Sequence, residues 1–248
     1  MKILYSALIP VLIIVGWYFA SFFSIINPLF LPSPDAVFIR LGEMLLSGEI
    51  IPDALATLGR MFVGFAISIL VGLPIGLVMG YYRRVYYSLE FVVDFFRSIP
   101  ATALFPLFLL FFGIGDEAKV AVVVFACSLI IIVNTMYGVR HSQEGRILAA
   151  RTMRAGKMDM FMKVIFPGAL PEIFTGLRIA ASFSLVLVVV TEMFIGTSMG
   201  LGRIIIDAQL VYRIPEMYAA IVLAGVIGYL INLGVQQVER RVVHWAGK

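Results

Sequence analysis

The sequence predicts an all-α integral membrane protein with six transmembrane helices. The 248-residue chain is 61% hydrophobic, has a mean hydropathy of +1.02 and carries only 14% charged residues. Soluble globular domains are about half apolar and about a quarter charged. The apolar residues form runs of about 20 residues, the length that crosses a bilayer as a helix. These runs lack the apolar–polar alternation of membrane β-strands, so helices are expected.

Six apolar runs are the expected spans, at about residues 3–26, 60–80, 92–112, 119–139, 177–197 and 217–237. The first is too long for the core of a signal peptide, and no A-x-A site follows it, so it is expected to remain as a span. Cytoplasmic loops collect Lys and Arg. With the N-terminus inside, fourteen of these residues fall on inner segments and five on outer ones. Both termini are therefore expected in the cytoplasm.

Residues 27–59 form the expected outer loop. The sequence LPSP at 31–34 breaks the chain, and the apolar residues of 37–45 then share one helical face. This pattern predicts an amphipathic helix lying on the membrane surface.

Small residues recur at every fourth position of the second span, at Gly64, Ser68, Gly72, Gly76 and Gly80. Such a stripe lets another helix approach closely. That helix belongs either to a second copy of the chain, along a dimer seam or sliding face, or to the same chain. Both interpretations fit the sequence.

Catalytic and metal-binding patterns are missing. No G-x-x-x-x-G-K-[ST] phosphate loop occurs, so this chain is not expected to bind ATP through one. Two histidines and the single Cys127 give no metal-site spacing. Residues 196–200, GTSMG, match a nucleophile elbow without its strand context or base, and are interpreted as a turn. The net charge of +4 comes from basic residues at span ends, which indicates topology and not nucleic-acid binding.

Five residues within the spans are candidates for a translocation path. Glu192 is the one carboxylate clearly inside a predicted span, where a charge costs about 2.5–3.5 kcal/mol. It either faces a path or makes a structural hydrogen bond, and Asn134 and Thr135 carry the same alternatives. Ser98 and Pro100 lie where prolines interrupt the third span, either lining a path or marking a simple kink.

The longest polar segment between spans covers residues 140–178 and is strongly basic. A helical stretch is expected before a break at Gly156. A short amphipathic helix should then place Met160 and Phe161 on one face, and a proline corner at 167–171 should end it. A face that is both apolar and basic needs a protein partner or the lipid surface.

This segment resembles the cytoplasmic loop of ABC importer permeases. The family pattern is Glu-Ala-Ala, three residues, Gly, nine residues, then Ile-x-Leu-Pro. The sequence LAARTMRAGKMDMFMKVIFPGALP places Ala149, Ala150 and Pro167 in register, whereas Leu148 replaces the glutamate and Arg154 the glycine. A large side chain is not expected to take the left-handed turn that glycine adopts. Arg154 is therefore expected to pair with an acidic residue of a partner.

Further motifs are similar to the nitrate, sulfonate and taurine branch of this family. They are LPSP at 31–34, SIP at 98–100, PLFLLFFGIGD at 106–116, NTMYGVR at 134–140, TEM at 191–193, GLG at 200–202 and ERRVVHW at 239–245. The resemblance implies a type I ABC importer permease fold. It divides the chain into a first helix with an outer loop (1–55), a permease domain (56–240) and a cytoplasmic tail (241–248).

The resemblance also implies a function. The chain would be the permease subunit of an ATP-driven importer in a bacterial inner membrane, carrying a small solute such as a sulfonate, nitrate or taurine. The implied partners are two ATP-binding cassette subunits, a second permease copy, an extracytoplasmic solute-binding protein and membrane lipid. ATP and Mg²⁺ would belong to the cassette subunits, so no enzymatic activity and no cofactor are expected in this chain.

The implied contact with the ATPase is a coupling loop at Ala149, Ala150, Arg154, Ala155, Gly156, Met160, Phe161 and Pro167. An ion-coupled secondary transporter is the alternative. It would need ionisable groups within the membrane, and Glu192 is the only candidate.

Overall fold

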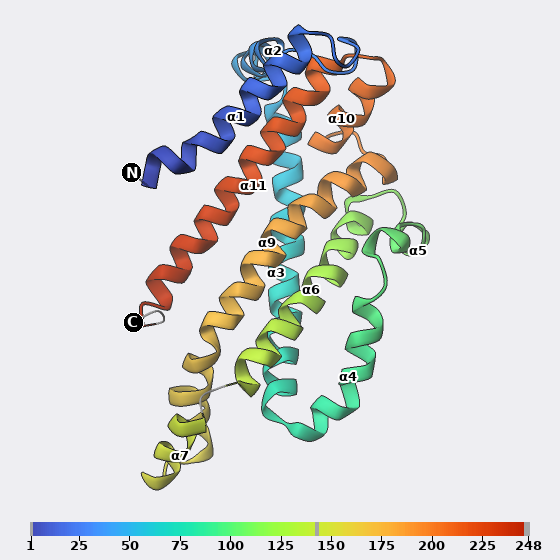
Figure 1. The fold of residues 1–248 in the computed structure, drawn as a ribbon. Coiled ribbons are helices and arrows are strands. Elements are labelled where there is room, and N and C mark those ends of the chain that lie inside the picture. The colour runs from blue at the N-terminus through green and yellow to red at the C-terminus, as the bar shows by residue number, and fades with distance from the viewer. Residues whose placement is uncertain (1, 142–143, 246–248) are drawn as a thin grey trace.

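The computed structural model describes residues 2–141 and 144–245, and these residues form helices and connecting turns without a strand. Long helices run side by side between two ends (Figure 1). One end carries α2 (Pro34–Leu46) and α10 (Leu201–Leu210) and is called the α10 end. The other carries α7 (Glu144–Thr152) and is called the α7 end.

Within the described ranges, four unbroken helical units are long and apolar enough to cross a membrane. They are α3 (Ile51–Tyr81), α6 (Asp116–Arg140), the unit Lys157–Ile195 and α11 (Ile214–Val242). A bent pair passes the same test together, and α1 (Lys2–Phe22) supplies a shorter apolar helix. The all-helical prediction is confirmed. The count of six holds only when the bent pair and α1 are each taken as one span.

The third predicted span, 92–112, is a broken helix. α4 (Arg83–Arg97) ends before Pro100, and the chain continues as a short 3-10 turn, η1 (Ala101–Leu104), and then α5 (Phe105–Phe112). The two parts are bent by 85°, which is more than the simple kink considered above. Pro100 has no N–H to continue α4, because a proline ring replaces it.

The predicted proline corner at 167–171 is wrong. α8 (Lys157–Met160), a π-helical turn, η2 (Phe161–Ile165), and α9 (Phe166–Ile195) follow one another as a continuous helical unit. Pro167 occupies the first turn of α9, a position where its missing N–H is tolerated. Proline disturbs the turn before it through a clash with the carbonyl four residues earlier, and that turn has the wider π form.

The small residues of α3 face α6 within the same chain. A Cβ on Gly72 would lie 2.8 Å from the carbonyl oxygen of Ser128, and one on Gly76 would lie 2.6 Å from Cβ of Thr135. The two backbones therefore approach too closely for any larger residue. The remaining members of the stripe are Gly64 and Gly80, which also contact α6 closely, and the buried Ser68.

The predicted amphipathic helix is present as α2, but protein covers its apolar face. Val37 and Met44 are buried in a cluster with residues of α10 and α11. Arg40 pairs with Glu216 of α11 at 3.2 Å. The expectation that this face rests on lipid is therefore wrong. The sequence reveals the apolar face, but its partner lies more than 150 residues further along the chain.

The predicted domain limits fall inside helices. The limit between residues 55 and 56 lies within α3, and that between residues 240 and 241 lies within α11. The last three residues of the predicted tail lie outside the described residues.

Candidate functional site

The structure brings together two of the five candidates for a translocation path. Pro100 and Asn134 line a cavity of about 420 Å³ between the α4–η1 break, α6 and α9, here called the mid-bundle cavity. Ser98 is the C-cap residue that follows α4. Thr135 is fully buried against α3. Glu192 lies in a different cluster at the α10 end.

The mid-bundle cavity has apolar walls and few polar groups. Aromatic rings of Phe96, Phe125 and Phe183 contribute to the walls. The Asn134 amide nitrogen donates a hydrogen bond to the carbonyl oxygen of Ile130 at 2.8 Å. Pockets of this size with a few polar groups commonly bind small molecules.

Arg97 is the only ionisable residue among the described residues that line this cavity. By the charge distribution that sets the orientation, Arg97 is one of the fourteen basic residues of the inner segments. The structure instead places it at the last position of α4, beside the middle of α6. The sequence feature that could have identified Arg97 as a cavity residue is its position directly before the SIP motif at 98–100.

Glu192 is held in a buried ion pair at the α10 end. Its carboxylate accepts hydrogen bonds from Arg60 Nη1 at 2.5 Å, from Thr57 Oγ1 at 2.9 Å and from the Gly202 N–H at 2.9 Å. Arg60 is 8% exposed and also donates from Nε to Asp116 at 2.7 Å. We call this group the Arg60–Glu192 cluster. Of the two interpretations of Glu192, the structure supports the structural hydrogen bond.

The first backbone amides of α10 bind the same cluster. The Gly200 N–H donates to Asp53 at 2.7 Å, and the Leu201 N–H donates to Thr57 at 2.9 Å. These amides have no partner within their own helix, and acidic groups also stabilise the positive end of the helix dipole. A Cβ on Gly202 would lie 2.2 Å from a carbonyl oxygen of α9. The GLG motif is therefore required for this close contact.

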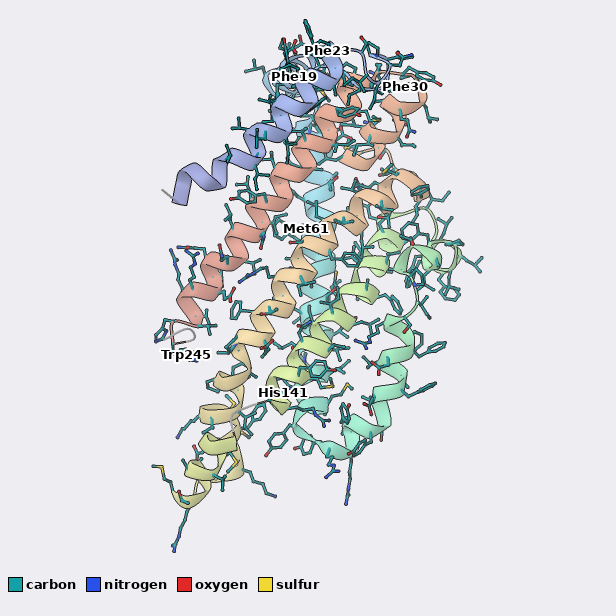
Figure 2. The ribbon with its side chains drawn as sticks, in the orientation of Figure 1. Phe19, Phe23, Phe30, Met61, His141 and Trp245 are labelled. Carbon is teal, nitrogen blue, oxygen red and sulfur yellow. The ribbon has the colours of Figure 1, made fainter. Side chains whose placement is uncertain are left out.

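The GTSMG segment at 196–200 has no histidine beside it in the described structure. His141 lies toward the α7 end, and His244 contacts Trp245 after α11, away from this turn (Figure 2). The interpretation of the segment as a turn agrees with the structure, in which it joins α9 to α10.

The coupling loop contains a helix C-cap centred on Arg154. The Ala155 N–H donates to the Ala150 carbonyl oxygen at 3.0 Å, and Arg154 has φ of +55°. This is the geometry of a Schellman motif, whose left-handed position usually carries glycine. The expectation that Arg154 avoids this conformation is wrong. Gly156 instead precedes α8 as its N-cap, with φ of −65°.

Met160 and Phe161 are partly buried against the bundle. The Phe161 ring lies 5.3 Å from the ring of Tyr81 on α3, in an edge-on arrangement. Both residues pack on the buried core that includes Val139 of α6. They anchor the coupling loop to the spanning helices. Of the remaining predicted residues, Ala149 is exposed and Pro167 is partly buried.

Other apolar residues of this loop are exposed. Their exposed fractions range from 54% to 81%, and the residues are Leu148, Met153, Met158 and Met162. We call these four residues the loop face. Methionine is flexible and polarisable, which suits it to adaptable protein contacts. Residue spacing alone missed this face, because its members come from α7, the turn after it, α8 and the π turn.

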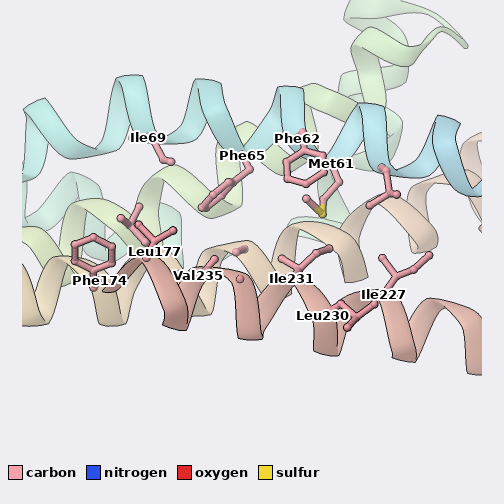
Figure 3. Close-up of a pocket in the computed structure, with 14 residues that line it drawn as sticks. Met61, Phe62, Phe65, Ile69, Phe174, Leu177, Ile227, Leu230, Ile231 and Val235 are labelled. Carbon is pink, nitrogen blue, oxygen red and sulfur yellow. The ribbon is translucent and has the colours of Figure 1, made fainter. Parts of the chain in front are cut away.

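A larger cavity of about 620 Å³ lies between α3, α9 and α11 (Figure 3). All the described residues that line it are apolar, among them Met61, Phe65, Leu177 and Ile231. No candidate path residue contributes to it.

Helices long and apolar enough to span a membrane, a cavity between them and a helical loop projecting at one end are features expected of a membrane transport protein. Residues 72–244 match the family of binding-protein-dependent transport system inner membrane components. The chain belongs to this family, and it is the permease subunit of an ABC importer and a multi-pass membrane protein.

Two relatives and one solved structure illustrate the similarity. The taurine transport system permease protein TauC of Escherichia coli (strain K12) is 31% identical over 97% of this chain and 88% of its own length. The bicarbonate transport system permease protein CmpB of Synechococcus elongatus is 30% identical over 77% of this chain and 69% of its own length. An inward-facing MetNI methionine ABC transporter chain shares the fold, with a TM-score of 0.68 and 24% identity, covering 78% of this chain and 95% of that chain.

The alternative of an ion-coupled secondary transporter is wrong, because the relatives and the solved structures are ABC transporter proteins. Glu192, on which that alternative depended, is paired with Arg60.

Proposed function

We propose that this permease is driven by a separate ATP-hydrolysing subunit that docks on the loop face. The main support for this proposal is that four apolar side chains are exposed on a helical element that projects from the bundle (Figure 1). An exposed apolar surface of this kind is typical of a protein contact. ATP and Mg²⁺ are assigned to the docked subunit, and this chain needs no cofactor.

The continuity of the unit Lys157–Ile195 supports a rigid transmission of force. A displacement of α8 is carried into α9, because no flexible break separates them. Contact between Phe161 and Tyr81 carries it also to α3. Tilting of these helices as rigid bodies would open the mid-bundle cavity alternately to the two ends of the bundle.

The proposed assembly contains two permease copies and two ATPase subunits, surrounded by membrane lipid in the inner membrane. The α7 end faces the cytoplasm, together with both termini. This orientation is supported by the excess of Lys and Arg on the segments assigned to the inside. A solute-binding protein delivers cargo at the α10 end. The relatives named for taurine and bicarbonate transport support a small solute of that kind as the cargo.

Co-purification with the cognate ATPase subunit tests the docking surface. The double substitution Met158→Asp and Met162→Asp should abolish co-purification, because two carboxylates would be buried without partners. Leu46→Asp is the matched control, since Leu46 is 92% exposed at the opposite end. Equal effects of the two variants would refute docking at the loop face.

Uptake in proteoliposomes that contain the complete assembly tests the energy source. Uptake of taurine or bicarbonate should require ATP on the side of the α7 end, and should survive collapse of proton and sodium gradients. Uptake driven by an ion gradient without the ATPase subunit would contradict the proposal.

A further inference from the structure

We propose that Arg97 is an anion-binding residue of the mid-bundle cavity, and that the cargo is a small organic anion whose sulfonate or carboxylate group pairs with its guanidinium. This inference rests on the proposed function, because it assigns a chemistry to the cargo at the cavity of the transport path.

Arg97 lies at the middle depth of the spanning helices. The 25 residues of α6 extend about 37 Å at about 1.5 Å per residue. The α6 residues that line the cavity together with Arg97 lie between Phe125 and Asn134. They are about 13–27 Å from the start of the helix. A charged side chain at this depth is costly, and such residues typically face a cavity and mark a substrate path.

The guanidinium of Arg97 has donors to spare. Its Nε pairs with Asp94 Oδ1 at 3.0 Å, one turn earlier on α4, and both side chains are about half exposed. A guanidinium carries five N–H donors in a planar fork. The recorded ion pair uses only the Nε edge, so the two Nη groups are available to an oxyanion. Paired contacts of this type suit carboxylates and similar planar or tetrahedral anions.

The remaining walls suit a small organic body. The rings of Phe96 and Phe125 meet edge to face at 5.9 Å, and Phe183 adds a third aromatic wall. Asn134 supplies a single amide near these rings, anchored by its bond to a backbone carbonyl. The cavity thus offers one cation, one amide and an apolar enclosure, which fits an anion on a short carbon chain.

Acidic residues lie beside Arg97 on the side of the α7 end. A small neighbouring cavity is lined by Glu90 and Asp94, and Arg97 lines both cavities. Asp94 is a positioning residue, because it fixes the guanidinium and competes with an incoming anion for it. Transport needs binding that is weak enough to release the cargo. Competition from the Asp94 carboxylate keeps the affinity of Arg97 for the cargo low enough for release.

Charge-selective labelling of the assembled transporter tests the proposal. A cysteine at Ile179, which lines the cavity, is introduced in a Cys127→Ala background and treated with sulfonatoethyl or trimethylammonium-ethyl methanethiosulfonate. In the Ile179→Cys protein the anionic reagent should be favoured, and Arg97→Gln should lower the anionic-to-cationic rate ratio by about tenfold, as expected for removal of a nearby partly screened charge. Arg97→Lys should largely retain the ratio, and Asp94→Asn should raise it.

Ile227→Cys is the matched control, because Ile227 lines the apolar cavity between α3, α9 and α11. Its labelling ratio should be unaffected by Arg97→Gln. An unchanged ratio at Ile179→Cys would overturn the proposal. If the Arg97→Gln protein fails to fold, the test is made in the Ile179→Cys protein with Arg97 intact. Small ions are then added to protect the cysteine from labelling. Ethanesulfonate should slow labelling and tetramethylammonium should not, and equal protection or none would overturn the assignment. Loss of ATPase co-purification would instead contradict the proposed function, since labelling does not need ATP.

Discussion

At the scale of single residues, the Arg60–Glu192 cluster is the most constrained polar feature of this chain. Its two charges lie 132 residues apart in sequence and meet at 2.5 Å in the buried interior. The cluster also binds the first amides of α10. A buried ion pair adds little over an apolar pair of the same volume, but removal of one partner leaves the other charge uncompensated.

Glu192→Ala should therefore lower the free energy of unfolding by up to about 3–5 kcal/mol, because the buried Arg60 would keep only Asp116, whose side chain is 60% exposed, as an acidic partner. Thermal unfolding of the purified protein in detergent measures the effect. Asp207→Ala is the control, because Asp207 is about half exposed and makes a longer ion pair, at 3.4 Å, with Arg203. That change should cost less than about 1 kcal/mol. Equal shifts in the two variants would contradict the account of the cluster.

The backbone of Arg154 gives a second prediction at this scale. A non-glycine residue in the left-handed conformation costs about 1–2 kcal/mol, so Arg154→Gly should stabilise the cap between α7 and α8. Hydrogen exchange at the Ala155 amide should slow accordingly, since that amide makes the capping bond. Arg154→Ala retains a Cβ and should give no such gain.

The Arg154→Gly variant also tests the role of the Arg154 side chain. The pairing of this residue with an acidic group on the ATPase remains a prediction. If Arg154→Gly left assembly and uptake unchanged, the specific pairing would be wrong, and the arginine would only add strain to the loop.

At the scale of elements, the close approach of α3 and α6 depends on residues without side chains. Gly76→Ala should destabilise the protein by about 1–3 kcal/mol, the usual cost of overpacking, because the new Cβ would lie 2.6 Å from Thr135. Gly234→Ala in α11 is the matched control, as it has nothing within 4 Å. Thermal unfolding compares the two. Ala is a better helix former than Gly, so the control should be neutral or slightly stabilised, and a similar change in both variants would contradict close packing as the reason for the stripe.

The coupling loop illustrates why periodicity in the sequence misjudged an element. Helical spacing places Met160 and Phe161 on one face of a short amphipathic helix, and in the structure both pack against α3 and α6. The expected proline corner is a continuous helix, because Pro167 falls in the first turn of α9. The exposed face is formed by other residues, among them Met158. The position of a proline within a turn decides whether it ends a helix, and that position depends on where the helix begins.

At the scale of the whole molecule, the two ends of the bundle should lie on opposite sides of the membrane. In a Cys127→Ala background, a membrane-impermeant maleimide should label Leu46→Cys in intact spheroplasts, because Leu46 is exposed at the α10 end. Met158→Cys should react only after the membrane is opened. Labelling is read by gel shift, and the reverse pattern would invert the orientation deduced from Lys and Arg.

The sequence by itself determined the class of the protein, because span length, hydropathy and the coupling-loop pattern are local properties of the chain. It also located most of the helices, and two of its five candidate path residues, Pro100 and Asn134, line the mid-bundle cavity. Only the tertiary structure decided what the polar residues of the spans do. Glu192 meets its partner from α3, and Arg97 reaches a cavity built by α6 and α9. Such partners lie far apart along the chain, so burial and charge pairing are settled only when the helices pack together.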